Sequence, residues 1–236
     1  MKAIVLAGGK GARLSPYSRI LPKPLVPIGD MPILEVLLRQ MKRAGIEEVI
    51  LTVGHLADLL CSFFQDGSRF GVHISYSREE FPLGTAGPLA LIKNLNETFL
   101  VTNGDVLTTM PLSDLIHFHE TQKAAATIAM HQRKVNIDLG VIQCDGDHKV
   151  VGYVEKPTFD YLVSMGIYVF EPRVLTYIPH NQYLDFPDLV HTLLKADEKV
   201  LGFPYDGYWQ DLGRSDDYER AAQDFETMRT QFLPED

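Results

Sequence analysis

The stretch KAIVLAGGKGARL, residues 2–14, starts with a short apolar run and continues as a glycine-rich loop. Residues 2–7 have the length and composition of a buried strand, which Gly8 and Gly9 end. Glycines leave backbone N–H groups uncovered, so such a loop can wrap around a phosphate chain. Arg13 adds a rigid fork of donors that suits phosphate oxygens. The stretch predicts a buried strand with a phosphate-binding loop at its carboxyl end.

Apolar runs and helical patterns alternate over the next hundred residues. This alternation predicts an α/β fold with a Rossmann-like, mixed but mostly parallel sheet and helices on both faces. The expected strands cover residues 2–7, 48–53, 72–76, 99–102 and 126–131, and the expected helices cover residues 32–44, 54–64, 85–95 and 112–122.

The pattern changes after His131, where strands are expected in close succession. They predict an antiparallel or mixed extension that forms one wall of a site. No repeat or linker divides the chain, so we expect one catalytic domain over residues 1–236. Its nucleotide-binding part would cover about residues 1–110 and its sugar-binding part about 111–236. The later strands are expected at 140–144, 150–154 and 165–170, and the later helices at 172–178, 186–195 and 216–229.

Composition excludes several classes of protein. Apolar residues make up 45% and charged residues 22% of the 236 residues, which is an ordinary globular composition. The net charge of −9 argues against a nucleic-acid partner, which requires clustered cations. No apolar run approaches the length that crosses a membrane. Cys61 and Cys144 form no CxxC pair, so we expect free thiols in a reducing, cytoplasmic setting.

Lys23 is the second candidate for phosphate chemistry. It lies between two prolines in LPKPLVP, residues 21–27, and prolines restrict where the ammonium can go. A positioned cation is what the developing charge of a phosphoryl transfer needs. Other phosphate loops fit poorly: a Walker loop needs Lys followed by Ser or Thr, and Lys10 is followed by Gly11. The dinucleotide fingerprint fails at Leu14, which weakens a dinucleotide oxidoreductase as the alternative.

The longer stretch GGKGARLSPYSRILPKPLVPIGDMPIL, residues 8–34, resembles the signature of the sugar-1-phosphate nucleotidylyltransferases, or NDP-sugar pyrophosphorylases. Ala12 and Ser18 are small departures from that signature. The resemblance implies the nucleotide-diphospho-sugar transferase fold, here without the C-terminal β-helix of some members. It also implies the reaction of a nucleoside triphosphate with a sugar 1-phosphate to give an NDP-sugar and pyrophosphate.

The resemblance assigns roles to residues that match the family's motifs. Arg13 and Lys23 would be catalytic. Asp105, at the carboxyl end of an expected strand, and Asp211 would hold Mg²⁺ as cofactor. The nucleotide-binding positions would be Leu6, Ala7, Gly8, Gly9, Lys10, Gly11, Gly84, Thr85, Ala86, Asn103 and Gly104.

The sugar phosphate would meet a separate set of residues, again by resemblance. Glu155 would contact the sugar hydroxyls, Lys156 the phosphate, and Gly140 would bring its backbone close to the sugar. Ser164 stands where the family often has Asn. A hydroxyl is shorter and has fewer donors than a carboxamide, so the identity of the sugar stays open.

The segment LGTAGPL, residues 83–89, is closest to GDP-mannose pyrophosphorylases and short sugar-phosphate guanylyltransferases. It favours guanylyl transfer to a mannose- or heptose-type 1-phosphate. The alternatives are a uridylyl- or cytidylyltransferase for another sugar or alcohol phosphate, and a non-catalytic nucleotide-binding regulator. A glycosyltransferase would want an Asp-x-Asp motif, but Asn103 stands at its first position. Histidines such as His117 and His119 form no ligand spacing and are interpreted as structural or surface residues. The oligomeric state stays open, a homo-oligomer included.

Overall fold

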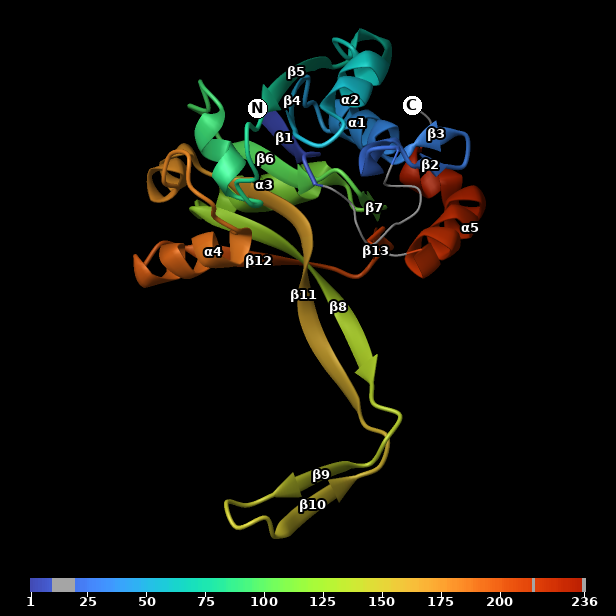
Figure 1. Ribbon diagram of the computed structural model, residues 1–236, viewed down its shortest axis with the longest axis vertical. Helices are drawn as coiled ribbons and strands as arrows, with labels where there is room; N and C mark the ends of the chain where they lie inside the picture. The colour runs from blue at the N-terminus through green and yellow to red at the C-terminus, as the bar shows by residue number, and fades with distance from the viewer. Residues whose placement is uncertain (10–19, 214, 235–236) are drawn as a thin grey trace.

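The computed structural model describes residues 1–9, 20–213 and 215–234 (Figure 1). Within these residues a seven-stranded sheet has the order β12-β8-β11-β6-β1-β4-β5. Of these strands, only β11 runs against its neighbours, so the sheet is mixed but mostly parallel, as the sequence predicts. The strands are β1 (Lys2–Leu6), β4 (Glu48–Val53), β5 (His73–Arg78), β6 (Phe99–Asn103), β8 (Ala126–Asn136), β11 (Thr158–Phe170) and β12 (Val200–Tyr205).

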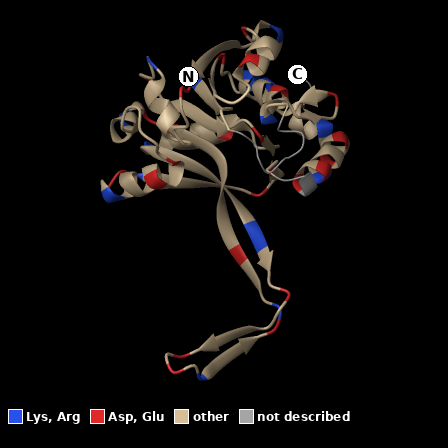
Figure 2. Ribbon diagram, viewed as in Figure 1, with Lys and Arg blue, Asp and Glu red and all other residues tan. Residues whose placement is uncertain are grey.

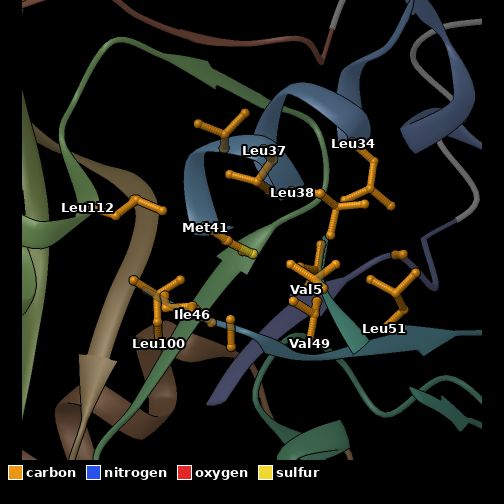
Figure 3. Close-up of a cluster of buried hydrophobic side chains, with 14 of the residues drawn as sticks. Val5, Leu34, Leu37, Leu38, Met41, Ile46, Val49, Leu51, Leu100 and Leu112 are labelled. Carbon is orange, nitrogen blue, oxygen red and sulfur yellow. The ribbon is translucent and has the colours of Figure 1, made fainter. Parts of the chain in front are cut away.

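One face of the sheet is covered by α1 (Ile33–Arg43), α2 (Ala57–Phe64) and α3 (Leu112–Gln122). In α1, Leu34, Leu37, Leu38 and Met41 recur at helical spacing and form one buried stripe. Figure 3 shows this stripe packed over strand residues such as Val5. Glu35 in the first turn and Lys42 and Arg43 in the last turn complement the helix dipole.

The opposite face is covered by α4 (Phe186–Lys195) and two short 3₁₀ segments, Gly87–Leu91 and Pro172–Tyr177. Because side chains alternate along a strand, Val5 contributes to the first core and Ile4 to this one. Each central strand is therefore buried on both sides, which explains its continuous apolar sequence.

A third cluster lies beside the sheet and surrounds α5 (Ser215–Phe232). Phe225 and Phe232 of this helix are buried against Ile28 and Leu107. Two small antiparallel pairs lie in this region: β2 (Pro27–Ile28) with β3 (Met31–Pro32), and β7 (Val106–Thr108) with β13 (Trp209–Asp211). The β7–β13 pair joins two segments that are about a hundred residues apart in sequence.

The outer parts of β8 and β11 leave the body and continue as a long two-stranded arm (Figure 1). We use the name arm for residues 132–162, beyond the last pairing of β8 with β12 at His131–Tyr205. A hairpin of β9 (Val141–Cys144) and β10 (Val150–Val154) forms its tip. The sequence predicts these strands, but the predicted wall beside the site is wrong for a single copy, because the arm points away from the body.

Two predicted helices are wrong as α-helices. Residues 85–95 form only the 3₁₀ segment Gly87–Leu91, where Pro88 lies in the first turn, and residues 172–178 likewise form 3₁₀ structure. Conversely, β8 and β11 are longer than predicted, and β7, β12 and β13 are not predicted at all. Among the described residues, no helix is long and apolar enough to cross a membrane.

Candidate functional site

A pocket of about 800 Å³ opens at the carboxyl ends of β1, β4 and β6, where an open α/β sheet binds its ligands. Its floor is the end of β1 with Gly8 and Gly9, and its sides come from the segments after β5 and β6 and before α4. The lining residues include Leu6, Ala7, Gly8, Gly9, Lys23, Gly54, Glu79, Gly84, Thr85, Asn103, Gly104, Asp105, Tyr183 and Asp185.

Three charged side chains converge at one end of this pocket. Lys23 Nζ donates a hydrogen bond to Asp105 Oδ2 and lies 3.7 Å from Asp211 Oδ1. The side chains of Lys23 and Asp105 are only 11% and 19% exposed, whereas that of Asp211 is 45% exposed. One ammonium between two carboxylates leaves a net negative charge, which faces the open pocket.

Backbone contacts hold the three groups in place. The residue after Asp211, Leu212, donates its N–H to Asp105 O at 3.1 Å, which extends the β7–β13 pairing. Lys23 begins the 3₁₀ turn Lys23–Leu25, in which Leu25 N–H bonds to Pro22 O at 2.8 Å. The flanking prolines keep this turn stiff, so Lys23 presents its ammonium from a fixed backbone.

Gly84 and Thr85 form a second wall of the pocket, and Asp185 holds them there. Thr85 donates from its N–H and its hydroxyl to Asp185 Oδ1, at 2.9 and 3.1 Å. Burial raises the pKa of Asp185, but hydrogen bonds from Tyr183 and Thr85 outweigh it and hold the pKa below its usual value. Gly84 has φ +80°, and a Cβ there would come within 2.5 Å of Leu184 O. Only glycine fits this close approach.

Glu79 is a pocket residue that the sequence reasoning missed. It follows β5, is half-buried, and accepts the N–H of Leu83 at 3.1 Å through Oε2. Its Oε1 would lie 2.6 Å from a Cβ on Gly8, so the carboxyl group sits directly beside the first loop. Burial raises the pKa of Glu79, and the bond from Leu83 offsets this only in part. The available signal was its position directly after β5, three strands from β6 but at the same edge of the sheet as Asp105.

Most of the nucleotide-binding positions expected from the sequence line this pocket: Leu6, Ala7, Gly8, Gly9, Gly84, Thr85, Asn103 and Gly104. Ala86 does not. Its side chain is buried in the core and its N–H bonds to Leu184 O at 2.9 Å, so it supports the wall from behind. Lys10, Gly11 and Arg13 lie outside the described residues.

The expected sugar-phosphate residues are not brought to the pocket of the same copy. Gly140, Glu155 and Lys156 lie on the arm, where the Tyr153 hydroxyl donates to Glu155 Oε2 at 2.9 Å. Ser164 lies at the base of the arm. Its hydroxyl donates to the Tyr168 hydroxyl at 3.1 Å and accepts the N–H of Gly166 at 3.2 Å.

Comparison with known proteins decides the family, because the family model described as "Nucleotidyl transferase" matches residues 2–228. The chain belongs to this family. It is 37% identical to a mannose-1-phosphate guanylyltransferase of Mycobacterium tuberculosis and 36% identical to a UTP–glucose-1-phosphate uridylyltransferase of Synechocystis. Each match covers 94% of this chain but only 64% and 63% of those relatives, so the chain spans less than two thirds of their length.

The nucleotidyl transferase fold is also seen in solved structures. A Bacillus anthracis protein assigned as a glucose-1-phosphate thymidylyltransferase, solved with sucrose, superposes with a TM-score of 0.77 at 26% identity. The match covers 94% of each chain. HddC from Yersinia pseudotuberculosis superposes with a TM-score of 0.73 at 25% identity, over 95% of this chain and 99% of the other. The predicted fold class is confirmed.

A divalent metal ion is in general part of this family's chemistry. The donors present here fit a hard cation, because carboxylate oxygens are its preferred ligands. Carboxylate oxygens of Asp105 and Asp211 both face the position that Lys23 Nζ occupies. Among the described residues, no three or more His, Cys, Asp or Glu side chains gather to hold a metal alone. Mg²⁺ is usually held by one or two carboxylates, and phosphate oxygens of the substrate and water molecules complete its coordination.

Proposed function

We propose that the protein is a sugar-1-phosphate nucleotidylyltransferase, which converts a nucleoside triphosphate and a sugar 1-phosphate into an NDP-sugar and pyrophosphate. The observation that carries the proposal is the Lys23–Asp105–Asp211 cluster in the same pocket as the Gly8–Gly9 loop. A positioned cation, two carboxylates and bare backbone N–H groups are what transfer between phosphates needs.

The chemistry needs no general base. The second pKa of a phosphate monoester is near 6, so the sugar phosphate is already a dianion at neutral pH and can attack the α-phosphorus directly. Pyrophosphate then leaves from the opposite side. The protein's task is to hold the two phosphate groups in line and to stabilise the charge that develops between them.

Each residue of the cluster has a separate part in this task. Lys23 places its ammonium beside the developing charge, and its fixed backbone means that little reorganisation is required. Asp105 and Asp211 would hold Mg²⁺, which when bound supplies charge neutralisation for the phosphates. Arg13, in the first loop, is proposed from the sequence signature to grip the triphosphate. In this proposal, residues 1–110 bind mainly the nucleotide and residues 111–236 mainly the sugar.

GTP is the proposed nucleotide, and the support comes from Glu79 and from the guanylyltransferase relative. An ionised carboxylate only accepts hydrogen bonds, through two oxygens side by side. Guanine offers two adjacent donors, N1–H and the 2-amino group, which match that pair. Uracil and thymine offer one N–H between two carbonyl oxygens, so a carboxylate meets repulsion on both sides. The proposed sugar is a mannose-type 1-phosphate, with a heptose-type 1-phosphate as its near alternative.

Uridylyl transfer is the second candidate, because the Synechocystis uridylyltransferase is nearly as similar to this chain as the guanylyltransferase. In that case Glu79 would have to contact the base in its protonated form, as a donor to a carbonyl oxygen. Burial already raises the pKa of Glu79, which lowers the cost of that form.

A coupled pyrophosphate assay tests the proposal directly. GTP, UTP, CTP and dTTP are each mixed with Mg²⁺, the protein and a panel of mannose, heptose and glucose 1-phosphates. We expect pyrophosphate release to be fastest with GTP and mannose 1-phosphate and to require both substrates. Release without a sugar phosphate would indicate simple hydrolysis, and no release with any pair would contradict the proposed reaction. Preference for UTP would select the second candidate.

A further inference from the structure

The arm exposes an unusual amount of apolar surface. Among the described residues, ten of the fifteen exposed large apolar side chains lie on the arm. Figure 2 shows few charged positions along the outer parts of β8 and β11. A two-stranded ribbon is marginally stable in water unless another surface covers one of its faces. The ten are Val135, Leu139, Ile142, Val150, Val151, Tyr153, Val154, Phe159, Tyr161 and Leu162.

The arm also keeps its tip away from its own pocket. The β8–β11 pairing is unbroken from Met130–Ser164 to Asn136–Thr158. At about 3.3 Å per residue this ladder is about 20 Å long. It begins at the carboxyl end of the sheet, where the pocket lies, and runs outward (Figure 1). Glu155 and Lys156 lie beyond its far end, so a continuous ladder prevents them from reaching the Lys23 cluster of the same chain.

We infer that the arm docks on a second copy of this chain and that Glu155 and Lys156 complete the sugar-phosphate side of that copy's pocket. The inference rests on the proposed function, because it takes the sugar phosphate as the ligand of these two residues. A two-fold axis between the copies makes the exchange reciprocal, so that each copy gives one arm and receives one.

Three features favour a second copy as the partner. Every copy has both a pocket that lacks its sugar-phosphate residues and an arm that carries them, so one symmetric contact satisfies both. The pocket mouth carries exposed apolar rings, Phe81 at 50% and Tyr183 at 63%, which can pack against an apolar arm. Lys156 has φ +46°, a conformation that side chains other than glycine rarely adopt and that clusters at functional positions.

The first test is the mass of the full-length protein in solution, measured by sedimentation at micromolar concentration. We expect a dimer. A monomer overturns the inference, whatever the activity of the sample. The variants Asp105→Asn and Glu155→Ala/Lys156→Ala are measured in the same way. Both should remain dimers, because Asp105 is in the pocket and the other two changes remove exposed polar groups without removing apolar arm surface.

The second test mixes these two variants at a sugar-phosphate concentration well below the KM of Glu155→Ala/Lys156→Ala, where each variant should be nearly inactive alone. After subunit exchange at equal amounts, half of the dimers are mixed. Each mixed dimer has one site with an intact Asp105 and an intact arm from its partner. We therefore expect about one quarter of the wild-type rate of pyrophosphate release. A mixture no more active than its two parents means that each arm serves its own pocket and overturns the exchange. Lack of release by the wild type overturns the proposed function instead.

Discussion

Strands β6 and β10 have similar apolar sequences, FLVTN and VVGYV, but opposite surroundings. In β6, Phe99, Leu100 and Val101 are fully buried between two helical layers. In β10, Val150 and Val151 are 57% and 62% exposed. The first strand belongs to a body whose packing is complete within one chain. The second belongs to an arm whose apolar face has no such cover, so apolar sequence alone does not say what a strand packs against.

Removing a charge from the site in the body should have the largest effect on activity. Lys23→Ala and Asp105→Asn should each lower the rate of pyrophosphate release about 100- to 1,000-fold, because each removes a preorganised charge from the reacting phosphates. Steady-state kinetics measure the loss, and near-UV circular dichroism checks the fold. Lys42→Ala is the matched control, since Lys42 is an exposed lysine that pairs with Glu47 away from the pocket. An unchanged rate in either variant would remove that residue from the mechanism.

A change in the arm should separate sugar binding from nucleotide binding. In Glu155→Ala/Lys156→Ala, we expect the KM for the sugar phosphate to rise about 10- to 100-fold, since hydrogen bonds to charged groups contribute about 1.5–3 kcal/mol. Nucleotide binding and Tm should not change, because both side chains are exposed on the hairpin.

Lys149→Ala removes another exposed charge from the same hairpin and is the control for this measurement. An equal rise in the KM values for both substrates would show that the arm acts on the whole site. No rise at all would show that Glu155 and Lys156 do not meet the sugar phosphate.

The body was predictable because its sequence signals are local. The bounds of β4 and α3 agree with the predicted ranges 48–53 and 112–122, since apolar periodicity and turn residues mark both ends. Lys23 and Asp105 were each singled out from the sequence, Lys23 by its flanking prolines and Asp105 by its place at the carboxyl end of an expected strand. The structure brings the two side chains into contact although they are 82 positions apart in sequence.

The arm and Glu79 were not predictable in the same way. Nothing local distinguishes a strand that folds back over a pocket from one that runs outward, because both alternate and both are apolar. The prediction of a helix at residues 85–95 was wrong for a different reason. The start of this segment is held by Asp185, a hundred residues away, and this tertiary contact and Pro88 keep the segment in short 3₁₀ turns. Glu79 acquires its role only when the fold places it beside Gly8.

Glu79→Gln should produce a smaller but more selective effect in the body. We expect GTP affinity to fall about 10-fold and the preference for GTP over UTP to shrink, because the amide replaces one acceptor with a donor. Titration calorimetry with each nucleotide measures both. The Leu83 N–H keeps an acceptor, since the amide oxygen can take the place of Oε2. An equal loss of affinity for all four nucleotides would show that Glu79 does not contact the base.

The same substitution should raise Tm at pH 7. The pKa of Glu79 is raised in the folded state, so above that pKa the native protein holds a charge that burial disfavours. The native state binds more protons than the unfolded state between the two pKa values, so this contribution to stability falls as pH rises. A neutral amide removes the cost. A lower Tm in Glu79→Gln would mean that the ionised carboxylate has a further stabilising partner in the folded protein, beyond the Leu83 N–H.

The smallest expected effect distinguishes a body histidine from an arm histidine. His119 is fully buried, with Nδ1 2.8 Å from Thr127 Oγ1 and Nε2 3.2 Å from Glu171 Oε1. Burial lowers the pKa of His119 below 6.5, and Glu171 offsets this only in part. The unfolded chain therefore binds a proton that the native state does not bind, and the stability of the folded protein falls as pH drops below about 6.5.

Thermal melting between pH 7.5 and pH 5 measures this loss, which should amount to a few °C for a protein of this size. His119→Gln should flatten the dependence on pH, even if the variant is less stable throughout, because the titrating group is gone. His148 lies exposed on the arm at φ +63°, a conformation that Asn tolerates. His148→Asn should therefore show the same dependence of Tm on pH as the wild type. If both variants flattened the slope alike, the arm would be as closely packed in solution as the body, and the contrast between the two regions would fail.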